Sequence, residues 1–238
     1  MDRLSAIVFI HGAGGSHQIW FNQLRVLGRQ RRVIALDLPG HGDSNGSGAE
    51  QIEVYRDLVE GFVTKLGLDR TVLVGHSMGG AITQGFALAY PDQLEAIGLV
   101  GTGARLRVHP KILAGLRDEP RGAVDFITKW ARAPGTPAEV VEQDAEAMLR
   151  TPVPVIERDF RACDAFDLME QVEEIGVPAL VICGADDLMT PPKYARYLHQ
   201  KIKGSQLVLI SGAGHMVMLE KPDEVNRAIE VFLEQLAS

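Results

Sequence analysis

One serine of this chain stands in a setting that suits nucleophilic chemistry. Positions 75–79 read GHSMG, which matches the pattern G-x-S-x-G with Ser77 at its centre. An apolar run precedes the pattern at 72–74, and a helical pattern follows from Met78 to about Tyr90. Side chains at the two outer glycines would collide with each other or with neighbouring backbone, so the glycines let the chain turn sharply and expose the serine oxygen. The spacing therefore predicts that Ser77 is a nucleophile on a tight strand-to-helix turn.

A serine hydroxyl is a poor nucleophile at neutral pH, so it needs a histidine base that an acid orients. Three histidines follow Ser77 in the chain, namely His109, His199 and His215. His215 ends the glycine-containing stretch 211–215 just after the last apolar run, whereas the other two lie in a predicted insertion and a predicted helix. Because the chain order for this type of turn is serine, acid, histidine, His215 is predicted to be the base.

Two adjacent carboxylates compete for the role of the orienting acid. Asp186 and Asp187 follow closely after the apolar run that begins at 179. Asp187, three residues past Gly184, is the better match, and Asp186 stays open as the alternative. The other position where the acid can stand, after the preceding strand, reads GTG at 101–103 and offers no carboxylate.

The negative charge that develops on an attacked carbonyl oxygen needs backbone N–H donors. Met78, the residue after the nucleophile, is expected to supply one of them. The loop 11–15, HGAGG, is expected to supply the other, with Ala13 as the donor and Gly12 or Gly14 as alternatives. Loss of one such donor raises a reaction barrier by ~3 kcal/mol.

Short apolar runs recur along the chain and alternate with helical patterns. Each run is continuously apolar, which indicates strands that are buried on both faces of a parallel sheet. The runs cover 6–10, 33–36, 72–74, 96–100, 179–182 and 207–210. This alternation predicts an α/β fold with a mostly parallel sheet of about six strands and helices on both faces. One predicted helix carries a single apolar face formed by Val54, Tyr55, Leu58, Val59, Phe62, Val63 and Leu66.

One long stretch interrupts the alternation. Residues 101–178 contain no convincing strand but many helix signals, among them TPAE at 136–139, which fits a capping box. A connection between parallel strands is normally far shorter. We therefore expect a helical cap at 104–170, inserted into an α/β core formed by 1–103 and 171–238.

Composition and charge exclude several classes of protein. The chain has 238 residues with 46% apolar and 23% charged side chains, as expected for one globular domain. Its net charge of −7 disfavours nucleic acid and anionic membranes as partners, because both require a basic face. Cys163 and Cys183 are too few for a disulfide scaffold and fit free thiols in a reducing cytosol. No apolar run suits a signal peptide or a membrane span, so a cytoplasmic location is expected.

Four sequence blocks stand in an order that resembles the α/β-hydrolase family over nearly the whole chain. They read HG at 11–12, DLPGHGDS at 37–44, GHSMGG at 75–80, and GADD at 184–187 with GH at 214–215. The resemblance implies a serine esterase with a small helical cap, which cleaves esters of small to medium acyl groups through an acyl-enzyme. Its triad would be Ser77, Asp187 and His215, and its oxyanion hole would use Ala13 and Met78. The partner would be a small ester, with no metal, no cofactor, no nucleic acid and no membrane, and with the oligomeric state left open.

Departures within the family narrow the chemistry. Serine at the turn, where similar dehalogenases and epoxide hydrolases carry aspartate, favours acyl chemistry. Gly14 stands where haloperoxidases and perhydrolases usually carry proline, and His76 stands where carbon–carbon bond hydrolases usually carry asparagine. Only residues 1–5 precede the first strand, so we expect a sheet near six strands. Carbon–carbon cleavage of diketones, lactone opening and a low-turnover ligand receptor stay open as alternatives.

Several further residues are interpreted as structural. The 37–44 block shapes a turn, and its His41 is expected, like His11, to hold a loop by hydrogen bonds. Trp20 and Trp130 are expected to pack rather than to line a pocket. The basic run formed by Arg105, Arg107, His109 and Lys111 reads as a solvated face, with a grip on an anionic acyl group as the alternative.

Overall fold

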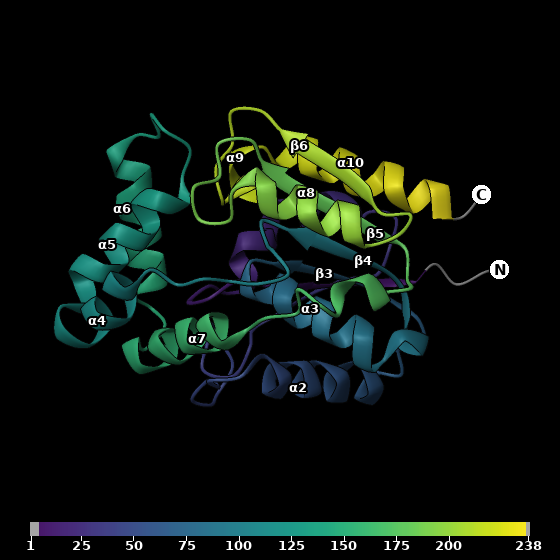
Figure 1. Cartoon of the computed structure of the whole chain (residues 1–238), viewed down its shortest axis with the longest axis horizontal. Helices are drawn as coiled ribbons and strands as arrows, with labels where there is room; N and C mark the ends of the chain where they lie inside the picture. Colours follow the sequence, from purple (N-terminus) through teal and green to yellow (C-terminus); the bar gives the residue numbers. More distant parts are fainter. Residues whose placement is uncertain (1–4, 237–238) are drawn as a thin grey trace.

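The computed structural model describes residues 5–236, and a six-stranded sheet lies at its centre (Figure 1). The strands are β1 (Ala6–Ile10), β2 (Val33–Leu36), β3 (Thr71–His76), β4 (Leu94–Val100), β5 (Ala179–Gly184) and β6 (Gln206–Ile210). They stand in the order β2-β1-β3-β4-β5-β6, and every neighbouring pair is parallel. The predicted α/β class and the predicted sheet are confirmed. Because β3 is central, a residue that leaves its carboxyl end stands at the middle of one sheet edge.

Side chains of β1 alternate between two apolar layers. Ile7 and Phe9 belong to one layer, and Val8 and Ile10 belong to the other. The first layer is covered by α1 (Phe21–Leu27) and α10 (Pro222–Leu236), and the second by α2 (Ile52–Lys65), α3 (Met78–Ala89) and α8 (Pro192–Lys201). The strands read as continuous apolar runs because both faces are buried. The short helices are η1 (His17–Trp20), η2 (Pro91–Gln93), η3 (Val172–Glu174) and α9 (Val217–Glu220).

The buried face of α2 is narrower than its sequence pattern predicts. Its buried residues are Ile52, Tyr55, Val59 and Val63. Val54, Leu58 and Leu66, by contrast, are 43%, 49% and 40% exposed. The apolar positions form two neighbouring stripes along the helix, and the core covers one of them. The single apolar face that the sequence predicts is therefore only partly buried, and these three side chains lie outside the buried part.

Four helices lie between β4 and β5, where the sequence predicts an inserted cap. They are α4 (Pro110–Asp118), α5 (Pro120–Ala131), α6 (Ala138–Met148) and α7 (Val153–Ala165), and we call them the helical insertion. In Figure 1, α4, α5 and α6 stand beside one edge of the sheet, while α7 runs back toward α3. An apolar cluster of their own, which includes Leu116, Val124 and Ile156, holds these helices together.

The segment that leads into the helical insertion lies against the segment that leaves it. Arg105 and Asp167 form an isolated antiparallel bridge, and their side chains make an ion pair of 3.1 Å. The N–H of Leu168 donates to the carbonyl of Ala104 at 2.7 Å. The division into a core of 1–103 and 171–238 and a cap of 104–170 stays a prediction, and residues 1–4 and 237–238 lie outside the described residues.

The capping box predicted at 136–139 is not formed. Helix α6 begins at Ala138 and has no side-chain cap. The hydroxyl of Thr136 donates instead to the carbonyl of Ala133 at 2.8 Å. A threonine hydroxyl can bond to nearby backbone in a turn as well as at a helix start, and here the turn bond is the one that forms. The prediction of the helix was right and the prediction of its cap was wrong.

Candidate active site

The backbone at Ser77 is strained. Ser77 follows β3 directly and has φ 53° and ψ −113°, and it is the one non-glycine with a positive φ among residues 5–236. The flanking glycines are a steric necessity, as the sequence predicts. A Cβ at position 75 would lie 2.0 Å from the carbonyl oxygen of Gly79, and one at position 79 would lie 2.4 Å from that of Ile10. Such strain persists only where the surroundings hold it, and it is concentrated at functional sites.

Hydrogen bonds hold this strained residue from both sides. The N–H of Ser77 donates to the carbonyl of Val100 at 2.9 Å. The carbonyl of Ser77 accepts from the N–H of Gly80 at 2.9 Å and from the hydroxyl of Thr102 at 2.8 Å. The main chain of the nucleophile candidate is thus anchored to β4 and to the loop that follows it, and its side chain is left free to act.

The carboxylate of Asp187 is fully hydrogen-bonded and almost entirely buried. Its Oδ1 accepts from the N–H groups of Met189 and Thr190, each at 2.8 Å. Its Oδ2 lies 2.9 Å from His215 Nδ1 and 2.9 Å from the hydroxyl of Thr190. Burial raises the pKa of Asp187, but the charge and hydrogen bond of His215 and the hydrogen bonds from Thr190 outweigh burial, so the pKa is lowered. Asp186, the alternative acid, is exposed.

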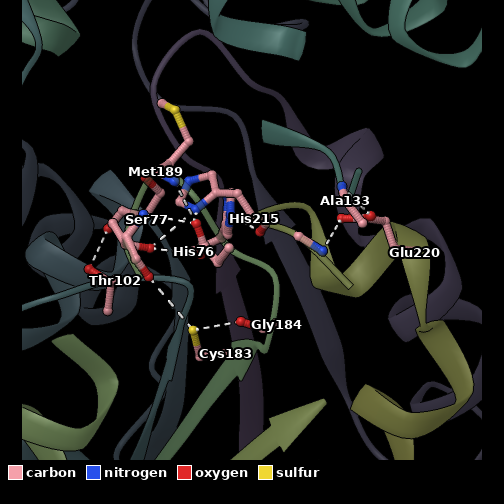
Figure 2. A network of polar contacts seen from close by, with 12 residues as sticks. His76, Ser77, Thr102, Ala133, Cys183, Gly184, Met189, His215 and Glu220 are labelled. Carbon is pink, nitrogen blue, oxygen red and sulfur yellow. Dashed lines mark hydrogen bonds and ion pairs between the residues drawn. The ribbon is translucent and has the colours of Figure 1, made fainter. Parts of the chain in front are cut away.

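The contact with Asp187 sets the protonation pattern of His215. Because a carboxylate only accepts, His215 Nδ1 must carry the proton, which leaves Nε2 of the neutral ring as an acceptor. Ser77 and His215 line the same cavity, and they lie together in Figure 2. The Ser77 hydroxyl makes no hydrogen bond within the described part of the chain. The structure therefore brings the three predicted triad residues to one place with an acceptor nitrogen available for the serine.

His76 supports His215 through both its ring and its hydrogen bond. The two rings are 4.6 Å apart, and His76 Nε2 donates to the carbonyl of His215 at 3.0 Å. Burial and the neighbouring His215 lower the pKa of His76 well below its ordinary value, so the ring is neutral. His76, the residue before the nucleophile candidate, thus has a structural role, as the sequence analysis expects, because it holds the loop that carries His215 in place.

The loop 11–15 lies against the serine turn with its peptide groups held. The carbonyl of Gly12 accepts from the N–H of Gly15 at 3.1 Å and from His11 Nδ1 at 2.8 Å. Because C=O and N–H point in opposite directions in a trans peptide, the N–H of Ala13 points away from these partners. The N–H of Gly14 donates to Asp159 at 2.9 Å. Gly14, one of the alternative oxyanion donors, is therefore already engaged.

Glu220 joins the histidine loop to the helical insertion. One of its oxygens accepts from the N–H of Gly214 at 3.0 Å, and the other accepts from the N–H of Ala133 at 2.9 Å (Figure 2). The N–H of Met216 also donates to the carbonyl of Ala131 at 3.1 Å. The position of the loop that carries His215 therefore depends on the end of α5.

A largely apolar cavity of about 270 Å³ opens at Ser77 and His215. Helices α5, α6 and α7 supply much of its lining through Ile127, Ala131, Ala147, Met148 and Phe160. Among the described residues that line it, Asp144 is the one carboxylate, and Arg132 holds it through two hydrogen bonds of 2.6 and 2.8 Å. The described lining is thus mostly apolar and contains no lysine or arginine side chain.

Other predicted residues lie away from this cavity. Trp20 is fully buried against Phe9, and Trp130 is 43% exposed against Phe126. None of the four residues of the basic run lines the cavity at Ser77, and Arg105 and Arg107 line a separate hollow beside Tyr194.

Cys163 lines the cavity as well, but it is not a second nucleophile. Burial, together with the charge of Asp159, raises the pKa of its thiol far above the ordinary value. The thiolate is the reactive form of cysteine, so this side chain stays inert. Cys163 and Cys183 are both free and buried.

Sequence reasoning missed three residues of this region. Thr190 binds the acid candidate, Asp159 binds the loop of the oxyanion donor, and Glu220 binds the histidine loop. All three lie within or beside predicted helices, and the periodicity that predicts a helix does not show which residues their side chains will bind. A threonine three residues after the acid was the one local signal available.

One group of side chains has the composition of a metal site. His17, Asp37 and Asp43 bring three potential ligand atoms within 4.8 Å of one another. Asp37 already accepts from His17 Nδ1 at 2.8 Å and from the N–H groups of His17 and Asp43 at 2.7 and 2.9 Å. These bonds shape the 37–44 turn, and none of the three residues lines the cavity at Ser77.

Comparison with known proteins agrees with this geometry. The family model described as "Alpha/beta hydrolase family" matches residues 7–228. The (E)-2-((N-methylformamido)methylene)succinate hydrolase of Acinetobacter baylyi is 28% identical over 96% of this chain and 90% of its own length. A thermophilic esterase of known structure is 40% identical with a TM-score of 0.87, over 97% of this chain and 90% of that one.

A third similar protein acts on a different kind of ester. The enol-lactonase from Burkholderia xenovorans is 28% identical with a TM-score of 0.90, over 97% of this chain and 91% of that one. All three relatives are hydrolases by their descriptions. None of the described helices of this chain is long and apolar enough to cross a membrane, and the cytoplasmic location stays a prediction.

Proposed function

The chain belongs to the alpha/beta hydrolase family, and on that basis we propose that it hydrolyses carboxylic esters through Ser77, His215 and Asp187. One observation supports this proposal most. A strained serine and a buried histidine–aspartate pair meet at one apolar cavity. The strain at Ser77 costs folding free energy, and strain of this kind is concentrated at functional sites.

The first half of the proposed reaction forms an acyl-enzyme. The Ser77 hydroxyl turns toward His215 Nε2 and gives up its proton while its oxygen attacks the ester carbonyl. Asp187 holds Nδ1–H and stabilises the imidazolium that results. His215 then passes the proton to the departing alkoxide, which leaves as the alcohol. The acyl group remains on the Ser77 oxygen.

The second half releases the acid. A water molecule gives a proton to His215 Nε2 and attacks the acyl carbonyl, and His215 returns that proton to the Ser77 oxygen as the acid departs. In both halves the N–H groups of Met78 and Ala13 stabilise the oxyanion. Met78 follows the nucleophile at the start of α3, where free N–H groups and the helix dipole favour negative charge.

The cavity favours an uncharged acyl group of small to medium size. Its lining from the helical insertion is apolar, and its single carboxylate is already neutralised by Arg132. A carboxylate on the acyl group would lose its hydration there without meeting a free cation, which is costly. In this proposal the helical insertion acts as a cap that selects the acyl group.

Lactone opening is a second candidate, and the similarity to an enol-lactonase supports it. A lactone is an internal ester, so the same attack by Ser77 would open the ring. The alcohol would then stay attached to the acyl-enzyme until water releases the hydroxy acid. Carbon–carbon cleavage and a low-turnover receptor are kept as outcomes of the test below.

The test compares initial rates on p-nitrophenyl esters from acetate to laurate. We expect the wild type to turn over short and medium esters and Ser77→Ala to lose at least about 10,000-fold in kcat. Ser211→Ala, which removes an exposed hydroxyl, is the matched control and should keep the wild-type rate. Equal rates for the wild type and Ser77→Ala would contradict the proposal.

The same samples separate the alternatives. A fluorophosphonate probe should label Ser77, as seen by peptide mass spectrometry, because it reports an activated serine without requiring a substrate. Faster turnover of five- and six-membered lactones than of linear esters would move the assignment to a lactonase. Labelling of Ser77 without turnover of either substrate would exclude the esterase and leave carbon–carbon cleavage or a receptor.

A further inference from the structure

A second buried carboxylate, Asp159 of α7, lies between the helical insertion and the loops of the core. Its side chain is fully buried, with 0% of its surface exposed. A buried carboxylate is costly unless its oxygens are hydrogen-bonded. Asp159 meets this requirement with partners from three other segments of the chain.

The contacts of Asp159 divide between its two oxygens. Oδ2 accepts from the N–H of Gly14 at 2.9 Å and from His41 Nε2 at 2.7 Å. Oδ1 accepts from the hydroxyl of Tyr55, which in turn accepts from the N–H of Ala49. The side chain therefore joins α7 to the 11–15 loop, to the 37–44 loop and to α2.

His41 supplies the charge that balances Asp159. Its Nε2 faces Asp159 and its Nδ1 lies 3.2 Å from the carbonyl of Pro39, so both nitrogens face acceptors. Only the doubly protonated ring can donate to both. Burial lowers the pKa of His41, but the hydrogen bond and charge of Asp159 outweigh burial and raise it. The pair is thus an ion pair sealed inside the protein.

The bond to Gly14 is the one that reaches the candidate active site. The peptide before Ala13 is held by His11 and Gly15 through the carbonyl of Gly12. The peptide after Ala13 is held by Asp159 through the N–H of Gly14. The Ala13 N–H belongs to the first of these peptides, and Asp159 fixes the second, so the backbone is held on both sides of Ala13.

We propose that Asp159 is a positioning residue that orients the oxyanion donor Ala13 from the helical insertion. The inference rests on the proposed esterase function and deepens it. It means that the oxyanion hole is complete only when α7 is seated on the core. The acyl cavity and the oxyanion hole are then assembled by the same packing event, because α7 contributes Phe160 to the cavity and Asp159 to the loop.

The decisive variants remove the acceptor for Gly14. Asp159→Ala removes every contact of the carboxylate. The double variant H41M/D159L removes both charges together, which a buried ion pair tolerates far better than the loss of one partner, so it covers the case in which Asp159→Ala does not fold. Asp159→Asn is the conservative variant, since it keeps one oxygen that can accept from Gly14. Ile229→Ala, a cavity in α10 beneath the opposite face of the sheet, is the control for lost stability alone.

Kinetics on the best p-nitrophenyl ester give the first readout. We expect kcat to fall by about 10- to 100-fold in Asp159→Ala and in H41M/D159L, a part of the ~100- to 1,000-fold that loss of an oxyanion donor costs. KM should stay within about twofold, because the donor acts on the transition state. Asp159→Asn should recover most of the lost kcat, and Ile229→Ala should keep the wild-type kcat at a temperature where it is folded.

The affinity for two inhibitors gives a second measurement, because a purely structural role for Asp159 would not change the ratio between the two affinities. An alkyl trifluoromethyl ketone forms an adduct with serine that carries an oxyanion, whereas the methyl ketone of the same chain length binds without one. We expect the variants to weaken the first inhibitor in proportion to kcat and to leave the second unchanged.

The outcomes are separable. If a folded Asp159→Ala or H41M/D159L keeps kcat within about twofold of the wild type, or loses affinity for both ketones alike, the positioning role is wrong while the esterase proposal stands. If the wild type itself hydrolyses no ester and Ser77 is not labelled, the proposed function fails first. A loss of kcat in Ile229→Ala equal to that in Asp159→Ala would also reject the inference.

Discussion

Two buried histidine–aspartate pairs stand on opposite sides of Ser77, and they differ in what the second ring nitrogen does. In the His215–Asp187 pair, Nδ1 and the carboxylate are 2.9 Å apart and Nε2 is left as an acceptor at the cavity. In the His41–Asp159 pair, the contact is 2.7 Å and both nitrogens of His41 are engaged. The shorter contact therefore belongs to the pair that has no atom left for proton transfer.

This difference shows that a close histidine–aspartate contact does not by itself identify a catalytic pair. The ring that keeps one free nitrogen at a cavity can move a proton, whereas the ring with two acceptors stays charged and holds structure. The pair at His41 has no free nitrogen, and its aspartate joins α7 to two loops and to α2. The pair at His215 is open toward the serine.

The largest expected effect separates the two histidines. His215→Gln should lower kcat on p-nitrophenyl esters by at least about 10,000-fold, because it removes the proposed base. It should lower the thermal midpoint less than His41→Gln does, because Met189 and Thr190 still donate hydrogen bonds to Asp187. His41→Gln should have a small effect on kcat and a large effect on stability. It leaves Asp159 buried without its ion-pair partner, which costs about 3–5 kcal/mol of stability, while kcat of the folded fraction should fall by at most about 10-fold. A dead but equally stable His41→Gln enzyme would overturn this distinction.

The next effect separates the two adjacent acids. Asp187→Asn should lower kcat by about 10,000-fold, because an asparagine allows the wrong histidine tautomer. Asp186→Asn is the matched control, since its carboxylate is exposed and should be replaceable within about twofold in kcat. Steady-state kinetics on both variants at one pH suffice as the measurement. Comparable losses in the two variants would make the choice of acid wrong.

Acid should destabilise the protein through the histidines that are buried as neutral rings. Burial and the neighbouring charge of His41 lower the pKa of His11 to about 4. Between about pH 6.5 and pH 4 the unfolded chain therefore binds up to one more proton than the folded chain, so stability falls as the pH falls, by about 1.5 kcal/mol between pH 6.5 and 5 from His11 alone. The buried His76 acts in the same direction.

His41 and Asp187, which belong to the two histidine–aspartate pairs, contribute to stability in different ranges of pH. The raised pKa of His41 contributes stability that is present at low pH and is lost as pH rises through that pKa. The lowered pKa of Asp187 contributes stability that is lost only as pH falls through its folded value. Urea denaturation at pH 7 and pH 5 should therefore show a loss that is smaller in His11→Asn. An equal loss in that variant would exclude His11 as the source.

The smallest effect concerns the threonine that supports the open pair. Thr190→Val removes the hydroxyl that donates to Asp187 at 2.9 Å, and we expect kcat to fall by about 10-fold, since one hydrogen bond to a charged group is worth about 1.5–3 kcal/mol. Thr71→Val is the matched control, because the buried Thr71 hydroxyl has no hydrogen-bond partner among the described residues. Its kcat should not change. An unaffected Thr190→Val enzyme would limit the orienting role to Asp187 alone.

Much of the fold was predictable because strand formation is readable in short stretches. The apolar run 6–10 predicts β1 with the bounds that the structure has, and the absence of strands between 101 and 178 predicts a helical stretch. The face of α2 was less predictable. Periodicity indicates which residues are apolar, but the number of stripes that the core covers depends on how the helix lies against the sheet.

Part of the candidate site could also be predicted from the sequence, and part of it could not. The glycine at position 75 could be explained from the sequence, because the collision it avoids is with Gly79, four residues on. The collision avoided at Gly79 is with Ile10 of β1, which only the folded sheet brings near. The sequence could not decide between Asp186 and Asp187, because adjacent side chains at the end of a strand point in different directions. The turn at Met189 and Thr190 supplies the N–H groups that hold Asp187 inward.

The sequence by itself determined the strands, the sharp turn at Ser77 and the order in which nucleophile, acid and base follow one another. Packing determined the partners of Asp159, which meets Gly14 across 145 positions, His41 across 118 and Tyr55 across 104. The physical reason is range. Sterics and periodicity act over a few residues and leave a local pattern, whereas a hydrogen bond between distant segments exists only once the whole chain has brought them together.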